Sequence, residues 1–149
     1  MLGRIVKIAI PIIIVAAIAF GIAAFRQALD ARVLAAGEFH SVSHKGKGSV
    51  RIVEKDDGRR FLQIDEFQTY HRPDLVVLLI SANDAFENEA VKAAGKFEVG
   101  RLKRDEGSME YELPIDLEMD RFNAVTVWNN EYEVNYTTAP LTKTKEKGK

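Results

Sequence analysis

The chain of 149 residues contains no cysteine. This absence excludes disulfide bonds, thiolate nucleophiles, and zinc or iron–sulfur sites built on cysteine. A domain without such cross-links depends on its hydrophobic core for stability. The sequence also lacks the H-E-x-x-H and G-x-S-x-G motifs and any glycine-rich loop that precedes a helix. No catalytic residues are therefore assigned, and the sequence gives no positive reason to expect an enzyme.

The chain as a whole also lacks a large net charge. Its formal net charge of -1 is the sum of three regions that differ in sign. Side chains give +3 in residues 1–36, -7 in residues 37–141 and +3 in residues 142–149. An acidic domain repels phosphate backbones, which excludes nucleic acid as an expected partner. We expect the basic tail to be disordered and solvated, with contact to anionic lipid as the alternative.

The N-terminal region contains one long apolar run. It begins at Ile8, ends at Phe25, and has no charged side chain in its 18 residues. A helix of that length spans about 27 Å, close to the roughly 30 Å hydrocarbon core of a bilayer. We therefore predict an uncleaved single-pass membrane anchor. The alternative is a signal peptide cut at Ala17-Ile18-Ala19, but that site lies inside the apolar run.

Flanking cations predict the orientation of this anchor. Arg4, Lys7 and the α-amino group precede the run, whereas Arg26 and Arg32 follow it close to an aspartate. The more basic side stays in the cytoplasm, so the rest of the chain is expected to be extracytoplasmic. The expected localisation is therefore the cell membrane, with the N-terminus inside.

Residues 26–36 are rich in good helix formers and are followed by Gly37, a common stop residue. We expect this segment to extend the membrane helix as a short stem. The expected domain limits are then 1–36 for the anchor and stem, 37–141 for the β domain and 142–149 for the tail.

Beyond position 37 the apolar pattern has a period of two, typical of strands with one buried face. Residues 75–80 are apolar throughout, as expected of a central strand covered on both faces. A tight hairpin is expected around Asn129-Asn130, and only residues 86–94 and 116–122 have a helical pattern. About eight short strands predict an all-β fold, an antiparallel β-sandwich or flattened barrel. Alternating runs include Val50 and Ile52, Leu62 and Ile64, Phe97 and Val99, Met109, Tyr111 and Leu113, and Tyr132, Val134 and Tyr136.

Possible metal ligands are few. His40 and His44 would share one side of a strand, but the only nearby further ligand is Glu38, so they are weak candidates. The adjacent Asp65 and Glu66 would point to opposite faces of a strand, which excludes a facing acid–base pair.

Three further features have a structural interpretation. Glu110 and Glu112 share a strand face that we interpret as a solvated sheet surface. We interpret Trp128 as a core residue, and the Gly46-Lys47-Gly48 segment as a hairpin turn.

Residues 37–141 contain a series of short motifs in a fixed order. They are Gly37-Glu38-Phe39, His44-Lys45-Gly46-Lys47-Gly48, Phe61-Leu62-Gln63-Ile64 through Phe67, Pro73-Asp74-Leu75, Val99-Gly100-Arg101, Tyr111-Glu112-Leu113-Pro114, Val125-Thr126-Val127-Trp128, Tyr132-Glu133-Val134-Asn135-Tyr136 and Ala139-Pro140-Leu141. The order of these motifs resembles the DM-thirteen domain family, whose small β domain is labelled an electron-transfer domain. This resemblance implies a β-sandwich outside the cytoplasm, either alone behind a membrane anchor or beside DOMON-type redox domains.

The sequence departs from this family at two positions. The proposed redox role of the family rests on a cysteine after the tryptophan, where this chain has Asn129, and an amide cannot form a thiolate. Arg72 stands where the family usually has glycine. The family motifs imply four candidate binding residues: His44, Asp74, Trp128 and Asn129.

Two functional hypotheses follow. The first is a membrane-anchored extracytoplasmic module that binds a protein or a small ligand and has no catalytic site of its own. Its partners would be the lipid bilayer, through the N-terminal helix, and that ligand. The alternative is a redox accessory domain with a bound haem or copper near His44 or Trp128. Only this alternative implies a cofactor.

Overall fold

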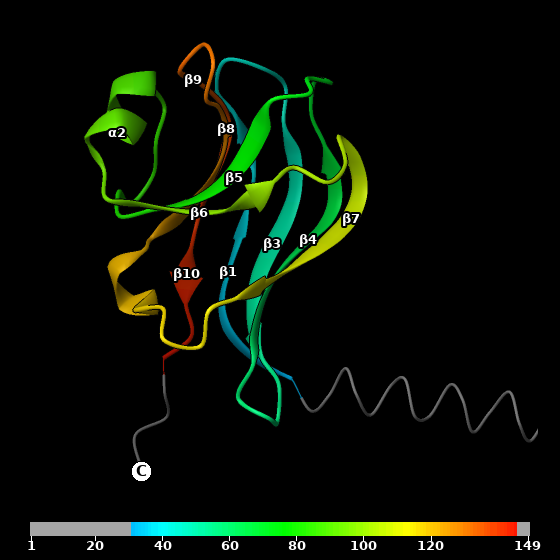
Figure 1. Cartoon of the computed structure of the whole chain (residues 1–149), viewed down its shortest axis with the longest axis vertical. Helices are drawn as coiled ribbons and strands as arrows, with labels where there is room; N and C mark the ends of the chain where they lie inside the picture. Colours follow the sequence, from blue (N-terminus) through cyan, green and yellow to red (C-terminus); the bar gives the residue numbers. More distant parts are fainter. Residues whose placement is uncertain (1–30, 146–149) are drawn as a thin grey trace, which may run out of the picture. The chain divides into compact units, whose positions relative to one another are not determined.

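A computed structural model describes residues 31–145 of the chain. In these residues ten strands form two antiparallel five-stranded sheets that pack face to face (Figure 1). Sheet A has the order β10-β1-β3-β4-β7, and sheet B has the order β2-β9-β8-β5-β6. The elements are β1 (Arg32–Glu38), β2 (His40–Ser41), β3 (Lys47–Glu54), β4 (Arg60–Gln68), β5 (Leu75–Ile80), α2 (Asn88–Ala93), β6 (Lys96–Arg101), β7 (Glu106–Leu113), the 3-10 helix η1 (Met119–Arg121), β8 (Ala124–Asn129), β9 (Val134–Pro140) and β10 (Thr142–Lys143).

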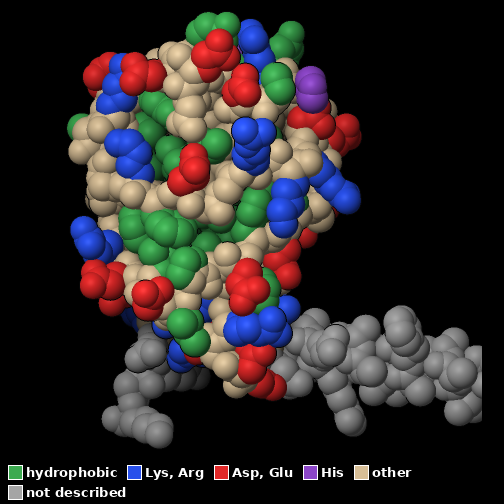
Figure 2. Space-filling view, in the orientation of Figure 1, with side chains coloured by type: hydrophobic (Ala, Val, Ile, Leu, Met, Phe, Trp, Pro, Cys, Tyr) green, Lys and Arg blue, Asp and Glu red, His purple; other side chains and the backbone are tan. Residues whose placement is uncertain are grey.

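The predicted all-β sandwich is confirmed, and it is not a closed barrel because each sheet keeps two edge strands. The two predicted helical segments contain α2 and η1. Edge strands β6 and β7 lie on the same side of the sandwich, and hydrophobic side chains are visible below β6 (Figure 2). The partly buried side chains that pack on the core include Phe97, Val99, Leu102, Leu117 and Met119.

The two sheets differ in how they are covered, which explains their sequence patterns. All six residues of β5 are buried, because the inner face of sheet B packs on sheet A and its outer face packs under the segment with α2. The continuous apolar run therefore marks a strand covered on both faces, as predicted. The outer face of sheet A instead carries exposed polar side chains, among them Glu110 and Glu112, as expected.

The expected helical stem is wrong at its C-terminal part, because residues 32–36 belong to strand β1. Ala35 is buried in the core and pairs with Lys143, while Ala36 pairs with Thr142. Burial and sheet pairing outweigh the helix propensity of this alanine-rich segment. Two residues assigned to the tail thus form strand β10.

Gly37 has a different role from the predicted helix stop. A Cβ atom at this position would lie 2.1 Å from the carbonyl oxygen of Pro140. The close approach of two backbones therefore requires glycine here, as is common where chains cross within a sheet.

The expected hairpin turn at Gly46-Lys47-Gly48 is also wrong, because β2 and β3 belong to different sheets. The segment between them crosses the sandwich. The Gly46 amide donates to Ser41 Oγ, and a Cβ on Gly46 would lie 2.2 Å from Thr137 Oγ1. Gly46 is thus needed for a tight crossing and not for a hairpin.

The hairpin of β8 and β9 is confirmed, but its turn comprises residues 130–133 and Asn129 ends strand β8. The apolar run from Ile8 to Phe25 lies outside the described residues, as does the chain beyond position 145. Within residues 31–145, no helix is long and apolar enough to cross a membrane.

Candidate functional site

Three connections meet at one end of the sandwich, and we call this the loop end: residues 42–46, 69–74 and 130–133. Leu75 pairs with Asn129, so the second connection ends beside the point where the third connection begins. The His44 amide donates to the Tyr136 carbonyl, which holds the first connection against β9. The loop end is the upper end in Figure 1, opposite the end at which β1 begins.

His44 lies in an aromatic stack at the loop end. Its ring centroid is 4.0 Å from that of Tyr136 and 5.5 Å from that of Tyr70. Tyr136 is buried, whereas 62% of Tyr70 is exposed. The three rings therefore lead from the core to the surface, and such contacts hold the exposed ring in place.

The surroundings of His40 differ from those of His44. Its Nε2 lies 2.6 Å from Asp84 Oδ1, its Nδ1 lies 3.1 Å from the Ser41 carbonyl oxygen, and its ring stacks on Phe86. Both nitrogens face oxygen acceptors, and the tautomer decides which of them donates. Within residues 31–145 there is no group of three or more His, Cys, Asp or Glu side chains suited to hold a metal ion.

Asn129 is 1% exposed and holds the turn of residues 130–133. Its Oδ1 accepts hydrogen bonds from the backbone amides of Glu131, at 2.9 Å, and Tyr132, at 3.0 Å. This asparagine thus acts as an internal turn cap, a role that its side chain can fill without any redox chemistry. It positions Tyr132, which is 60% exposed.

The other predicted site residues are divided between core and surface. Trp128 is 5% exposed and packs on the outer face of sheet B, in agreement with its interpretation as a core residue. Asp74 is exposed and precedes β5. Asp65 is paired with Arg51, while Glu66 is exposed at a β-bulge with φ +50°, so regular alternation does not hold there.

A buried polar network that the sequence did not single out joins β8 and β9. Asn135 Nδ2 donates to Thr138 Oγ1 and to the Ala85 carbonyl, and Thr138 Oγ1 also bonds Thr126 Oγ1 at 2.8 Å. These satisfied buried groups tie β8 and β9 to the segment before α2. The only sequence signal is the presence of polar residues inside otherwise apolar strands.

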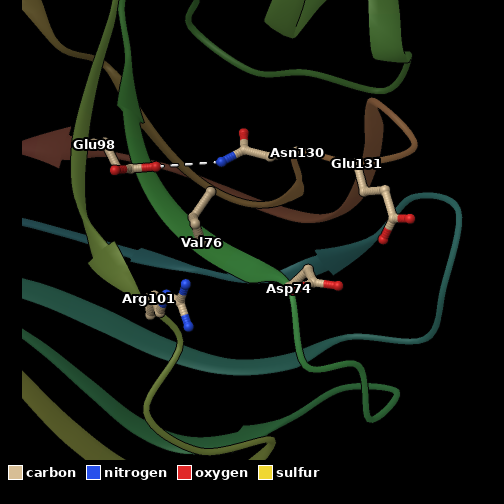
Figure 3. Close-up of a pocket in the computed structure, with 6 residues that line it drawn as sticks. All are labelled: Asp74, Val76, Glu98, Arg101, Asn130 and Glu131. Carbon is tan, nitrogen blue, oxygen red and sulfur yellow. Dashed lines mark hydrogen bonds between the residues drawn. The ribbon is translucent and has the colours of Figure 1, made fainter.

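A pocket of about 550 Å³ opens beside the loop end (Figure 3). Asn130 Nδ2 donates to Glu98 Oε1 across it at 3.3 Å. Apart from Asp74, none of its residues was a candidate from the sequence, since they come from three separate segments. The lining residues are Asp74, Val76, Glu98, Arg101, Asn130 and Glu131.

The backbone of Arg101 is held by a core tyrosine, Tyr111, which does not itself line the pocket. The Tyr111 hydroxyl donates to the Arg101 carbonyl at 2.8 Å and accepts from the Lys103 amide at 2.9 Å. Burial raises the pKa of this phenol above its ordinary value, because the phenolate would lose hydration, while the Lys103 amide lowers it by a smaller amount. Tyr111 thus joins the edges of the two sheets as a neutral group.

Comparison with family models gives one match, to the family described as "Electron transfer DM13", over residues 38–141. Comparison with curated proteins and with solved structures gives no match. The matched residues include strands β2 to β9 and every residue placed at the loop end, but not β10 or most of β1. The chain therefore belongs to the DM13 family.

Proposed function

We propose that this protein is a membrane-anchored extracytoplasmic binding module whose loop end contacts a partner protein. The observation that carries the proposal is the pair of large exposed aromatic side chains at that end, Tyr70 and Tyr132. Tyr70 is held by the His44 stack, and Arg72 lies over the Tyr132 ring at 5.6 Å. Preordered tyrosines and arginines are the residues most enriched at the energetic centres of protein interfaces.

The direction of β1 supports the same proposal. This strand begins at the end of the sandwich opposite the loop end (Figure 1). The loop end is therefore remote from the point at which the chain enters the β domain, which suits a surface that contacts a partner. The three connections also carry side chains of both signs, which suits selective recognition of a protein surface.

The location of the β domain can be tested with single cysteines, because the chain has none of its own. Tyr132→Cys at the loop end and Asp56→Cys in the exposed turn at the other end would be introduced into the full chain. Both should react with a membrane-impermeant maleimide in intact cells. Labelling only after the cells are permeabilised would refute an extracytoplasmic domain. Release of the full chain from membranes by carbonate would refute the anchor.

Partner binding can be tested by photo-crosslinking in membranes. A benzophenone amino acid at position 132 should give a discrete adduct with a protein, while the same group at position 56 should not. The adduct should disappear when purified full chain in detergent is added in excess. Equal adducts at both positions would contradict the assignment of the loop end as the binding surface.

Electron transfer is the second candidate, because the family description names it and the rings of Tyr136, His44 and Tyr70 form a continuous series of ring contacts. The described residues offer no complete metal ligand set, so a bound group would depend on His44 with a ligand from elsewhere. The purified full chain should be examined by visible spectroscopy and metal analysis, with and without added haem or copper. A Soret band or stoichiometric copper that is lost in His44→Ala would favour this candidate over the binding module.

A further inference from the structure

We propose that the pocket beside the loop end binds a dipolar ligand, one that carries a carboxylate and at least one cationic group. This inference rests on the proposed binding function and names the chemistry of the ligand. The pocket has both signs of charge on its lining, and its volume of about 550 Å³ lies in the range of small-molecule sites. The argument has three steps.

The first step is the bulge that brings Arg101 to the pocket. Leu78 pairs with Glu98, Val77 with Gly100 and Val76 with Arg101, so β6 has one extra residue at this point. In a regular strand, residues 98 and 101 would face opposite sides of the sheet. The bulge places both beside the outer-face residues Val76 and Leu78, as bulges often do where they redirect a side chain.

The second step is that opposite charges line this pocket without neutralising each other. Within residues 31–145, the guanidinium of Arg101 and the carboxylates of Asp74 and Glu131 have no side-chain hydrogen bond or ion pair. In Figure 3, Arg101 lies on one side of Val76, and Asp74 and Glu131 lie on the other. A single charge on a ligand would satisfy only one of these sides, whereas a dipolar ligand satisfies both.

The third step concerns which part of the ligand meets which residue. Arg101 presents a planar guanidinium that suits a carboxylate, and the free carboxylates of Asp74 and Glu131 suit an ammonium or a guanidinium. The side chain of Val76 supplies an apolar floor for methylene groups between the two charges. Three carboxylates against one guanidinium make the lining acidic, so the cationic part of the ligand should make more of the charge contacts than its carboxylate does. Free arginine, or a peptide with neighbouring basic and acidic side chains, has this chemistry.

Nuclear magnetic resonance of the full chain in detergent can test this site with three probes: L-arginine, agmatine, and the capped peptide acetyl-Gly-Arg-Gly-Glu-Gly-amide. Binding of L-arginine or of the peptide should shift the resonances of the side-chain amide of Asn130. The probe that binds more tightly of these two identifies whether the ligand is a free amino acid or a peptide. Agmatine, which is arginine without its carboxylate, should bind more weakly than L-arginine.

Substitutions separate the two sides of the pocket. Arg101→Gln should lower the affinity for L-arginine or the peptide about three- to fivefold, the usual size of one exposed charge contact. It should not lower the affinity for agmatine, which has no carboxylate. Asp74→Asn and Glu131→Gln should each lower the affinity for every probe that binds. Glu112→Gln, the same change on the exposed face of sheet A, is the matched control and should leave binding unchanged.

Several results would overturn the proposal. One is the absence of chemical-shift changes with all three probes. Another is agmatine binding as tightly as L-arginine. The third is a loss of affinity with Glu112→Gln that equals the loss with Glu131→Gln. The crosslink at position 132 separates this failure from a failure of the proposed function. If the adduct forms while no probe binds, only the dipolar pocket is wrong.

Discussion

Asn129 provides the most direct test of how the loop end is held together. Replacement by alanine removes the acceptor of two backbone amides, those of Glu131 and Tyr132. Both amides are only partly buried, so water replaces some of the lost interaction, and each bond should contribute about 0.5–1.5 kcal/mol. Asn129→Ala should therefore lower the free energy of unfolding by about 2 kcal/mol, a decrease in Tm of roughly 8 °C for a domain of this size.

The assay is thermal unfolding of the full chain in mild detergent, followed by fluorescence. The protein has one tryptophan, and Trp128 is buried next to the substituted residue, so its emission reports on this region directly. Asn130→Ala is the matched control, because that exposed residue makes only a 3.3 Å bond to Glu98. Its Tm should stay within about 2 °C of the unsubstituted protein.

Asn129→Cys adds a second readout that concerns the family's cysteine position. Sulfur is a weak hydrogen-bond acceptor, so this variant should be less stable than the unsubstituted protein. Because position 129 is 1% exposed, the thiol should react slowly with a maleimide until the domain unfolds, whereas Tyr132→Cys should react at once. An Asn129→Ala Tm equal to that of Asn130→Ala, or rapid labelling of Asn129→Cys, would refute our description of this turn.

Three further variants test other parts of the fold. Gly37→Ala should destabilise the domain by about 2 kcal/mol or more, because the new Cβ would meet the Pro140 carbonyl oxygen. Hydrogen exchange should locate the loss of protection in β1 and β10, and unchanged exchange there would contradict the close approach. Asn135→Ala should cost about 2–4 kcal/mol in denaturant unfolding, since it leaves the buried Thr138 hydroxyl without one partner, and a loss below about 0.5 kcal/mol would show that the network is not needed. The raised pKa of Tyr111 favours the neutral phenol in the folded state, so its contribution to stability is complete below pH 10, the ordinary phenol value, and is lost as the pH rises above it. Tm measured from pH 8 to 11 should therefore fall less steeply in Tyr111→Phe, and parallel curves would contradict this.

Local sequence patterns predicted strands reliably wherever each face of the strand is either wholly buried or wholly exposed to solvent. The alternation in β7 predicted one buried and one solvated face, and the apolar run of β5 predicted a strand covered on both sides. In both cases the pattern of each strand records its burial directly, because side chains of a strand alternate between two faces. The interpretation of Trp128 as a core residue, which rested on the large apolar area of its side chain, is also confirmed.

The patterns failed where a distant segment decides the conformation. Residues 32–36 have a helical composition, yet they form β1 because Ala35 and Ala36 pair with residues more than a hundred positions away. Gly37 and Gly46 resemble a helix stop and a turn, but each permits contact with β9 or the chain that follows it. Such contacts leave no periodic signal near the residue concerned.

The sequence alone therefore determined the fold class, the family and the absence of any cysteine-based site, since these depend on composition, period and the order of motifs. The tertiary structure decided which side chains meet at the loop end. A bulge in β6 places Arg101 beside Val76, and the turn after β8 adds Asn130 and Glu131 to the same pocket. Registers and bulges arise from packing between strands that are far apart in the chain, so only the folded sandwich brings these residues together.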